Sequence, residues 1–430
     1  MAWNNAKDNH EVKNHCEKNK NNNFDKSIWK KLNHRFQHLP VALTGLALGL
    51  CGIASALDTI FKKFYHPNCW WISIGFIAVA SFLLLLATIR NFSHKKVVLF
   101  EAKEPLLSSF LPTYAMTLMC IAGFIAGWEK GNYFGKVPPC QVIGAILMCL
   151  SVVIQIVCIV AFVKNVLLKH NWDKDSMYGS WLVPTVGPAT AATFTGRFNE
   201  NILPVWFFQI IWFFAFANYV VLFVVVTYSL LFKKKADIHK FPSIAVYFAP
   251  ANLVLAGFLQ TFAIPSVEPY YIHTPEVQAF IGHNWDFINI AIIFMACMAF
   301  TYNILLWFFI VKIFNSTKFA YIFASVTFPL AIGASAMLYI YGYLGLYMHV
   351  THDHSHIITM LEQFFRYIGY IFTVVATCII LYVATRFIIN IMKSLVTNMN
   401  DDKHHCVYTA AQTAESNTAC PSKVVSEEQK

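Results

Sequence analysis

Apolar residues in this chain gather in ten long segments that are separated by shorter polar stretches. Most segments reach the length of about 20 residues that an α-helix needs to cross the hydrocarbon core of a bilayer. They run over residues 39–60, 70–89, 105–127, 141–163, 180–196, 204–232, 241–265, 287–311, 319–344 and 365–392. The fifth is diluted by threonine, yet its place between two clear spans predicts that it also crosses. We therefore predict an all-α, multi-pass integral membrane protein.

The composition agrees with a membrane protein and excludes a soluble one. Hydrophobic residues make up 57% of the 430 residues and charged residues 13%, and the mean hydropathy is +0.53. Soluble chains carry about a quarter charged residues, so this chain has too few to cover a surface in water. The net charge of +10 does not indicate a nucleic-acid partner, because no basic stripe is interleaved with aromatic residues. The expected surroundings are a lipid bilayer, and we expect no nucleic acid to bind.

Basic residues alternate in number from one loop to the next. The two termini and every second loop hold 26 of the 32 lysines and arginines, whereas the intervening loops hold 5. Because basic loops stay on the cytoplasmic side, both termini are predicted in the cytoplasm of a plasma-membrane protein with an even number of spans. Residues 1–36 then form a polar extension, 37–392 the transmembrane domain, and 393–430 a polar tail that we predict to be disordered.

Prolines are confined to alternate segments. Every odd-numbered segment contains at least one, and no even-numbered segment has one in its interior. The prolines are Pro40, Pro112, Pro184, Pro188, Pro250 and Pro329. Successive odd segments are 72, 72, 66 and 79 residues apart, measured between Pro40, Pro112, Pro184, Pro250 and Pro329. A regular interval with one proline-containing and one bulky helix indicates an internal repeat of five helical hairpins.

The two kinds of segment differ in what they can face. Proline kinks a helix and frees a backbone carbonyl, which a membrane tolerates only beside other helices or cavity water. Small residues let helices approach closely, so we expect the five odd segments inside and the five bulky segments toward lipid. The predicted fold is a quasi-five-fold ring of five kinked helices around a central pore. Functionally, this arrangement predicts a conduit.

The predicted path is polar but neutral. The interiors of the odd segments contain hydroxyls and amides, and Asp58 at the end of the first segment is expected at the membrane interface. The candidates for lining the path are Thr44, Thr117, Thr190, Asn252 and Thr327. Without an intramembrane carboxylate or histidine, we expect passage without a tightly bound intermediate. Hydroxyl donors and the positive ends of broken helices favour anions, although hydroxyl oxygens also accept bonds from hydrated cations.

Four sequence elements carry a family resemblance. LPVALTGLALGL, WLVPTVGP, APANLVLAG and TFPLAIGASAM resemble, in order and spacing, the tellurite-resistance/C4-dicarboxylate transporter (TDT) family. This family includes the bacterial TehA-type proteins and the slow anion channels of plant guard cells. The resemblance implies ten helices in five hairpins around a pore, assembly as a homotrimer, and transport of small anions or C4-dicarboxylates, or a tellurite-resistance phenotype.

The resemblance also implies a gate. In similar proteins, a phenylalanine on the ninth helix plugs the pore, and the matching residue here is Phe328, directly before Pro329. A ring at a narrow point blocks ions by its bulk and by dewetting. Composition alone does not single out this residue, because the chain contains 39 phenylalanines.

Other signals point less directly to function. The motif HVTHDHSH contains His349, His352, His354 and His356, which suit zinc, copper or pH sensing, but the spacing fits no helical ligand pair, and we predict a solvated loop and no metal. Cys69 and Cys140 fall in loops on the same side, and whether they form a disulfide stays open. Arg197 and Arg366 either attract anions at a mouth or make structural pairs.

These observations favour one function and leave alternatives open. The chain contains no Walker A, HExxH or GxSxG motif, so we predict no enzyme and no cofactor. The leading interpretation is an anion channel or transporter with a neutral pore gated by a phenylalanine. The alternatives are a proton-coupled malate, dicarboxylate or sulfite carrier on the same fold, and a membrane sensor or receptor.

Overall fold

The computed structural model describes a helical protein. The described residues are 36, 39–63, 70–128, 138–169, 177–232, 238–263, 275–317, 319–351 and 355–397, and no strand occurs among them. Pro40–Phe387 forms one compact unit, and Met1–Leu39 with Ile388–Lys430 forms a second. Of the second unit, residues 388–397 continue a helix that begins in the first. The predicted extension, apart from residue 36, and most of the tail 393–430 lie outside the described residues.

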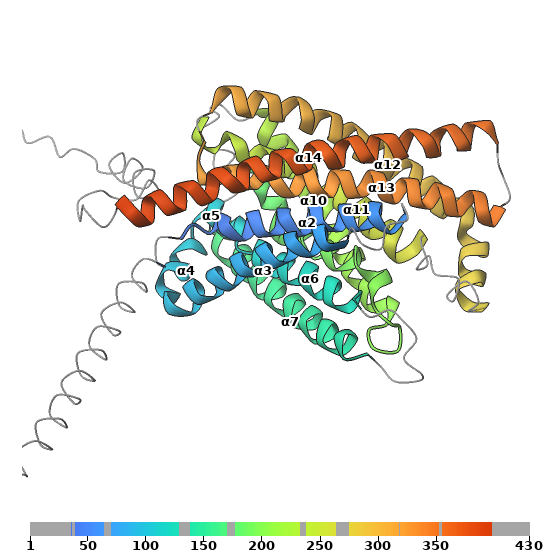
Figure 1. Ribbon diagram of the computed structural model, residues 1–430, viewed down its shortest axis with the longest axis horizontal. Helices are drawn as coiled ribbons and strands as arrows, with labels where there is room; N and C mark the ends of the chain where they lie inside the picture. The colour runs from blue at the N-terminus through green and yellow to red at the C-terminus, as the bar shows by residue number, and fades with distance from the viewer. Residues whose placement is uncertain are drawn as a thin grey trace, which may run out of the picture. The chain divides into compact units, whose positions relative to one another are not determined.

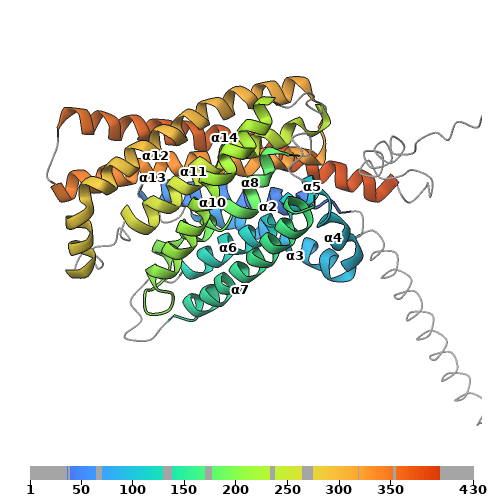
Figure 2. The same cartoon turned by 180° about the vertical axis from the view of Figure 1, so that it is seen from behind.

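The long helices follow the predicted segments. They are α2 (Ala42–Lys63), α3 (Trp70–Ser93), α6 (Thr113–Ala126), α7 (Pro139–Phe162), α10 (Val205–Phe232), α11 (Ala249–Phe258), α12 (Pro275–Ser316), α13 (Ala324–Thr351) and α14 (His356–Thr397). Shorter helical elements join or extend them: α4 (Lys95–Glu101), α5 (Pro105–Phe110), η2 (Val163–Leu167), η6 (Ile238–Phe248), η7 (Leu259–Ala263) and η8 (Tyr321–Phe323). Figure 1 and Figure 2 present the arrangement from opposite sides.

The helices fall into two classes by burial. Within the described part of the chain, nine helical stretches are long and apolar enough to cross a bilayer. In the stretches that contain α2, α6, α11 and α13, between 72% and 89% of the most apolar window is buried. In the stretches that contain α3, α7, α10, α12 and α14, only 22% to 33% is buried. The prediction that proline-containing segments lie inside and bulky segments outside is therefore confirmed for these nine.

The fifth predicted segment, 180–196, is not one continuous helix. It consists of η4 (Gly179–Trp181), α8 (Leu182–Val186), α9 (Ala189–Ala192) and η5 (Thr195–Arg197). Two prolines and two glycines, Gly187 and Gly196, interrupt a stretch whose threonines are weak helix formers. Residues 179–195 are nevertheless buried, apart from Val183. The fifth segment is thus an interior element like the other odd segments, but it is broken into single turns.

Most of the prolines predicted as kinks lie at helix starts or junctions. Pro40 precedes α2, Pro112 lies between α5 and α6, and Pro188 directly precedes α9. Pro250 occupies the first turn of α11, where the 3₁₀ helix η6 passes into an α-helix. The first turn is where the missing N–H of proline costs nothing, because that N–H has no partner within the helix. Pro184 and Pro329 lie inside α8 and α13.

The buried elements contact one another in a closed order. Helix α2 packs against α6, α6 against α9, α9 against α11, α11 against α13, and α13 against α2. Most outer helices pack beside an inner one: α3 on α2, α7 on α6, α10 on α8 and α9, and α12 on α11. Both views have α13 running alongside α2, with α6 on the opposite side of α2 (Figure 1 and Figure 2).

Two helices begin well before the predicted boundaries. Helix α12 begins at Pro275, twelve residues before the predicted start of the eighth segment, and α14 begins at His356, nine residues before the predicted start of the tenth segment. Arg366, expected at the start of the tenth segment, therefore lies inside α14. The basic loop 90–104 contains α4, which turns the chain between α3 and α5.

Candidate functional site

The seam between α2 and α13 is built on glycine. A Cβ atom added at Gly49 would lie 2.2 Å from Oγ1 of Thr327 and 2.4 Å from its Cβ. A Cβ added at Gly52 would lie 2.8 Å from Cβ of Ala331. Glycine at these positions lets the two helices approach until side chains of one touch the backbone of the other. This close approach fixes the position of the residues next to Thr327 on α13.

Phe328 is partly exposed within the buried part of α13. It is the single residue between Phe323 and Ile340 that is not buried. On α2 and the turn before it, Gly52 is the single residue between Leu39 and Ala56 that is not buried. The two lie against each other, because Cδ2 of Phe328 is 3.7 Å from the position of a Cβ on Gly52. Phe328 and Gly52 are thus both partly accessible at the place where the two inner helices touch.

Three predicted lining threonines lie at seams between inner helices. The hydroxyl of Thr44 is 2.7 Å from that of Thr113 and donates to the carbonyl of Val41 at 2.9 Å. Thr117 donates to the carbonyl of Thr113 at 2.7 Å and to that of Thr44 at 3.2 Å, and so joins α6 to α2. Thr327 donates to the carbonyls of Ala324 and Gly45, and so joins α13 to α2. These hydroxyls are buried, and their role along a path stays a prediction.

The fourth candidate belongs to an amide cluster. Asn252 of α11 donates to Oδ1 of Asn303 on α12 at 3.2 Å, and Asn303 donates to Oδ1 of Asn252 at 2.9 Å. Gly333 of α13 completes the cluster, because a Cβ there would lie 2.2 Å from Oδ1 of Asn303. The cluster connects an outer helix to two inner ones. Asn303 did not emerge from the sequence, because it lies in a segment of the bulky type that is expected to face lipid. The signal that could have identified it is an amide in the middle of such a segment.

Thr190, the fifth candidate, differs from the others. It lies in α9, within the broken fifth segment, and is 2% exposed. Its hydroxyl oxygen has no hydrogen-bond partner among the described residues. A buried hydroxyl without a partner costs free energy unless water or a ligand satisfies it. Thr190 is therefore the one of the five candidates whose hydroxyl has no hydrogen-bond partner in the described part of the chain, and its role along a path stays a prediction.

An ion pair joins two inner elements at the end where α2 finishes, which we term the Asp58 end. Nη2 of Arg197, in η5, lies 2.5 Å from Oδ2 of Asp58, and the Asp58 side chain is 9% exposed. The carbonyl of Arg197 accepts a hydrogen bond from Nε2 of Gln141, and its guanidinium lies 5.6 Å from the centre of the Phe124 ring. Asp58 is thus buried and paired, and its depth relative to the membrane interface stays a prediction. Arg197 forms an ion pair, whereas its attraction of anions at a mouth stays a prediction.

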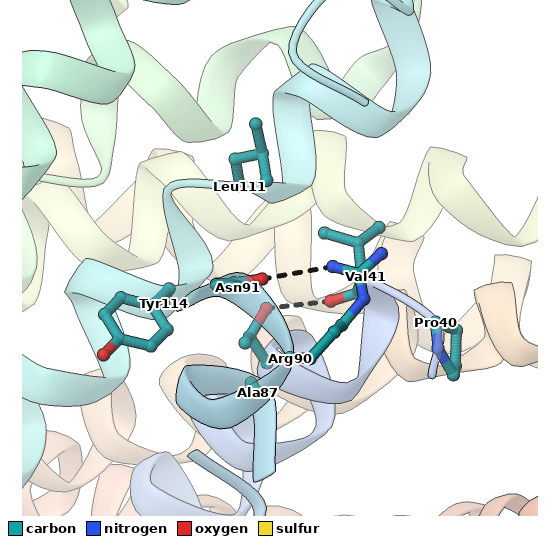
Figure 3. A pocket seen from close by; sticks show the side chains of 8 residues that line it. Pro40, Val41, Ala87, Arg90, Asn91, Leu111 and Tyr114 are labelled. Atoms are coloured by element: carbon teal, nitrogen blue, oxygen red, sulfur yellow. Dashed lines mark hydrogen bonds between the residues drawn. The ribbon is translucent and has the colours of Figure 1, made fainter. Parts of the chain in front are cut away.

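A small pocket lies at the opposite end, where α2 begins (Figure 3). It is lined by Pro40, Val41, Thr44, Ala87, Arg90, Asn91, Leu111 and Tyr114. Arg90 donates to Oδ1 of Asn91 at 3.2 Å and forms a buried, two-pronged ion pair with Glu101 of α4. Burial raises the pKa of the Glu101 carboxyl, and the hydrogen bond from Arg90 opposes this rise. The pair fastens α4 to the end of α3.

The remaining sequence signals give no site among the described residues. His352 and His354 lie outside them, His356 is exposed at the start of α14, and no cluster of three or more potential metal ligands occurs in the described part. Cys69 also lies outside the described residues, so its pairing with Cys140 stays open. The guanidinium of Arg366 lies 5.9 Å from the ring centre of Tyr370, one turn along α14.

A family model for voltage-dependent anion channels (SLAC1) matches residues 38–388 of the chain. The chain belongs to this family. The match extends over the whole set of inner and outer helices, and it confirms the resemblance to the TDT family that the four sequence elements carry. No curated protein matches the sequence.

Membership of the voltage-dependent anion channel family defines the general activity. The chain is an anion channel or transporter that crosses the membrane several times. Proteins of this family are channels or transporters and not enzymes. Small anions are accordingly the class of substrate that the family indicates.

Proposed function

We propose that the chain is an anion channel whose path runs inside a ring of five buried helical elements and is closed at Phe328. The observation that carries this proposal is the paired exposure of Phe328 and Gly52 within stretches of α13 and α2 that are otherwise buried. A partly accessible aromatic ring between inner helices has the position required of a steric and dewetting gate. The match to voltage-dependent anion channels supplies the class of ion.

The ring itself is supported by the order of contacts. Each of the five inner elements packs against the next, and the last packs against the first. The buried fifth segment, although broken, lies between α6 and α11 in this order. We propose that it also crosses the membrane, which would give ten crossings in five hairpins. The family resemblance extends the proposal to a homotrimer in the plasma membrane with both termini in the cytoplasm.

The substrates we propose are small inorganic anions or C4-dicarboxylates. Hydroxyl groups supply donors without a fixed charge, and the unpartnered hydroxyl of Thr190 is one such donor in a buried position. A neutral path of this kind passes anions without holding them tightly.

A second candidate function is a proton-coupled carrier of malate, other dicarboxylates or sulfite. The observation that favours it is Asp58, a buried carboxylate within a membrane-spanning helix. Ionisable residues at such positions often serve proton relays in transporters. A carrier would require flux to follow a proton gradient, whereas a channel would not.

Anion flux into proteoliposomes tests both candidates. The comparison is between wild type, Phe328→Ala and the matched control Phe308→Ala, whose ring is exposed on the outer helix α12. Chloride, nitrate, sulfite and malate are each offered with and without a proton gradient. We expect Phe328→Ala to raise anion flux several-fold without a gradient, and Phe308→Ala to match wild type. Flux that follows the proton gradient equally in all three proteins would contradict the gate and favour the carrier.

A further inference from the structure

The Asp58–Arg197 pair connects two inner elements that are not neighbours. Helix α2, which carries Asp58, packs against α6 and α13. Element η5, which carries Arg197, packs against α6 and η7 instead. Because α2 and η5 are not adjacent in the closed order of inner elements, an ion pair between them must cross the space inside the ring or pass over the end of α6. The pair therefore lies at the Asp58 end of the path and not within a seam.

Residues from further inner elements gather around this pair. The hydroxyl of Tyr339 on α13 lies 3.5 Å from that of Ser55, one turn before Asp58, and Tyr339 is near both charges. Phe124 of α6 lies beneath the Arg197 guanidinium at 5.6 Å. Together with Asp58 and Arg197, these residues come from α2, α6, the fifth segment and α13. Four of the five inner elements thus converge on the pair, as expected for the mouth of an axial path.

Arg197 is held in place independently of Asp58. Nε2 of Gln141 donates to the carbonyls of Ala126 and Arg197 at 2.5 and 2.9 Å, and the N–H of Asn199 donates to Oε1 of Gln141 at 3.1 Å. Cδ of Arg197 lies 2.9 Å from the position of a Cβ on Gly127, so this glycine leaves room for the side chain. These contacts hold the backbone at Arg197 without Asp58, and the Phe124 ring lies beside the guanidinium.

The chemistry of the pair matches that of a permeating anion. A guanidinium presents a planar fork of N–H donors that binds carboxylates and other oxyanions with two parallel hydrogen bonds. The Asp58 carboxylate carries the same single negative charge as nitrate, and like nitrate or either carboxylate of a dicarboxylate it accepts hydrogen bonds from N–H donors. Arg197 is 19% exposed, so an ion arriving from the Asp58 end can reach it. The Asp58 carboxylate and an entering anion therefore compete for the Arg197 guanidinium.

We infer that Asp58 is a tethered anion that occupies Arg197 at the mouth of the path and is displaced by each entering anion. This inference rests on the proposed channel function and deepens it. Arg197 attracts the anion and sets selectivity for anions over cations. Asp58 lowers the affinity of the mouth, so that an ion leaves Arg197 as readily as it arrives. The exchange makes and breaks hydrogen bonds alone.

Charge-neutralising variants test the inference because the two residues have opposite expected effects. Nitrate currents and reversal potentials are measured in planar bilayers for Asp58→Asn and Arg197→Gln, both in wild type and in the Phe328→Ala background. Asp58→Asn is expected to lower the half-saturating nitrate concentration and raise nitrate-over-sodium selectivity, each by about tenfold, the lower end of the effect of focused charge on local ion concentration. Arg197→Gln is expected to shift both quantities in the opposite direction.

Two further variants distinguish an Arg197 that binds anions at the mouth from an Arg197 that serves only in a structural ion pair. Arg197→Lys keeps the charge but loses the planar fork, so selectivity over sodium should remain while the preference for nitrate over chloride declines. Arg386→Gln removes an exposed cation on α14 that lies beside Tyr382, and it should leave every quantity unchanged. Reversal potentials do not depend on the number of folded channels, so reduced yield of a variant does not affect the comparison.

The outcomes distinguish the inference from the function on which it rests. Opposite shifts for Asp58→Asn and Arg197→Gln support the tethered anion. Unchanged selectivity in both, or a loss of current in both with unchanged reversal potential, overturns it and leaves a structural ion pair. If neither wild type nor Phe328→Ala carries anions with any combination of variants, the proposed channel function itself fails.

Discussion

Single glycines determine how closely α2 approaches α13. At Gly49, the space for a Cβ is already taken by the side chain of Thr327. At Gly75, on the outer helix α3, a Cβ would meet no atom within 4 Å. Replacing glycine by alanine would therefore meet a filled space at Gly49 on α2 and an open space at Gly75 on α3. The position of Phe328, one residue beyond Thr327, depends on this seam.

Gly49→Ala is expected to destabilise the protein by about 1–3 kcal/mol, the usual cost of overpacking a filled interior. The helices must separate, because both Oγ1 and Cβ of Thr327 lie within 2.4 Å of the new Cβ. Gly75→Ala is the control, and it should be neutral or stabilising by up to about 1 kcal/mol, since alanine favours a helix. Thermal unfolding of both variants in detergent measures the difference. Equal stability of the two would contradict the close seam.

The sequence was informative about residue types but not about their partners. It indicated Phe328 through its place before Pro329 and the family elements, and it listed Thr44, Thr117 and Thr327 as polar interior residues. Which hydroxyl bonds which carbonyl depends on the rotation of each helix, which composition does not determine. Asp58 and Arg197 were each noted separately. Both end segments on the same predicted side of the membrane, and this shared side is the signal that points to their pairing.

At the level of elements, four of the six prolines predicted as kinks lie at helix starts or junctions, whereas Pro184 and Pro329 lie inside helices. Position in the sequence established that prolines mark alternate segments, but not where each helix begins. Pro40 and Pro250 occupy helix starts, since α2 begins at Ala42 and α11 at Ala249. The fifth segment was predicted as one span because hydropathy averages over a window. Mean hydropathy does not reflect that Pro184, Gly187 and Pro188 together interrupt a continuous helix.

The amide cluster of Asn252 and Asn303 connects an outer helix to the inner ring, and its energy is testable. Asn303→Leu leaves the amide of Asn252 buried without its partner, which is expected to cost about 1–3 kcal/mol. Replacing both residues by leucine should cost less than the sum of the single changes, because their coupling is removed as a unit. The measurement is the unfolding free energy of the four proteins in a double-mutant cycle.

Asn218→Leu provides the matched control for this cycle. Asn218 lies on the outer helix α10, and its amide donates to the carbonyl of Phe214 in the same helix at 2.7 Å. Its replacement should therefore change stability by less than about 0.5 kcal/mol. If the costs of Asn252→Leu and Asn303→Leu simply add, each amide acts alone and the connection between α11 and α12 does not depend on the pair.

For the whole molecule, the alternation of helix types was predictable because burial follows composition. Small and proline-containing segments are buried, and segments rich in large apolar side chains are exposed. The number of continuous spans was not predictable in the same way, because it depends on local breaks in the fifth segment. The closed order of the inner elements also required the structure, since sequence spacing indicates a repeat but does not determine how its copies close.

The sidedness of the molecule decides which end an anion meets first, and it can be measured. The 26 basic residues on the termini and alternate loops predict that these face the cytoplasm. An epitope tag inserted within residues 129–137 should therefore be detected in intact cells. A tag after Lys430 should be detected only once the cells are permeabilised. The opposite labelling would show that the orientation is the reverse of the predicted one and that the Asp58 end faces the cytoplasm. In the expected orientation, Arg197 and Asp58 face the outside, so external nitrate should respond to their substitution more strongly than internal nitrate.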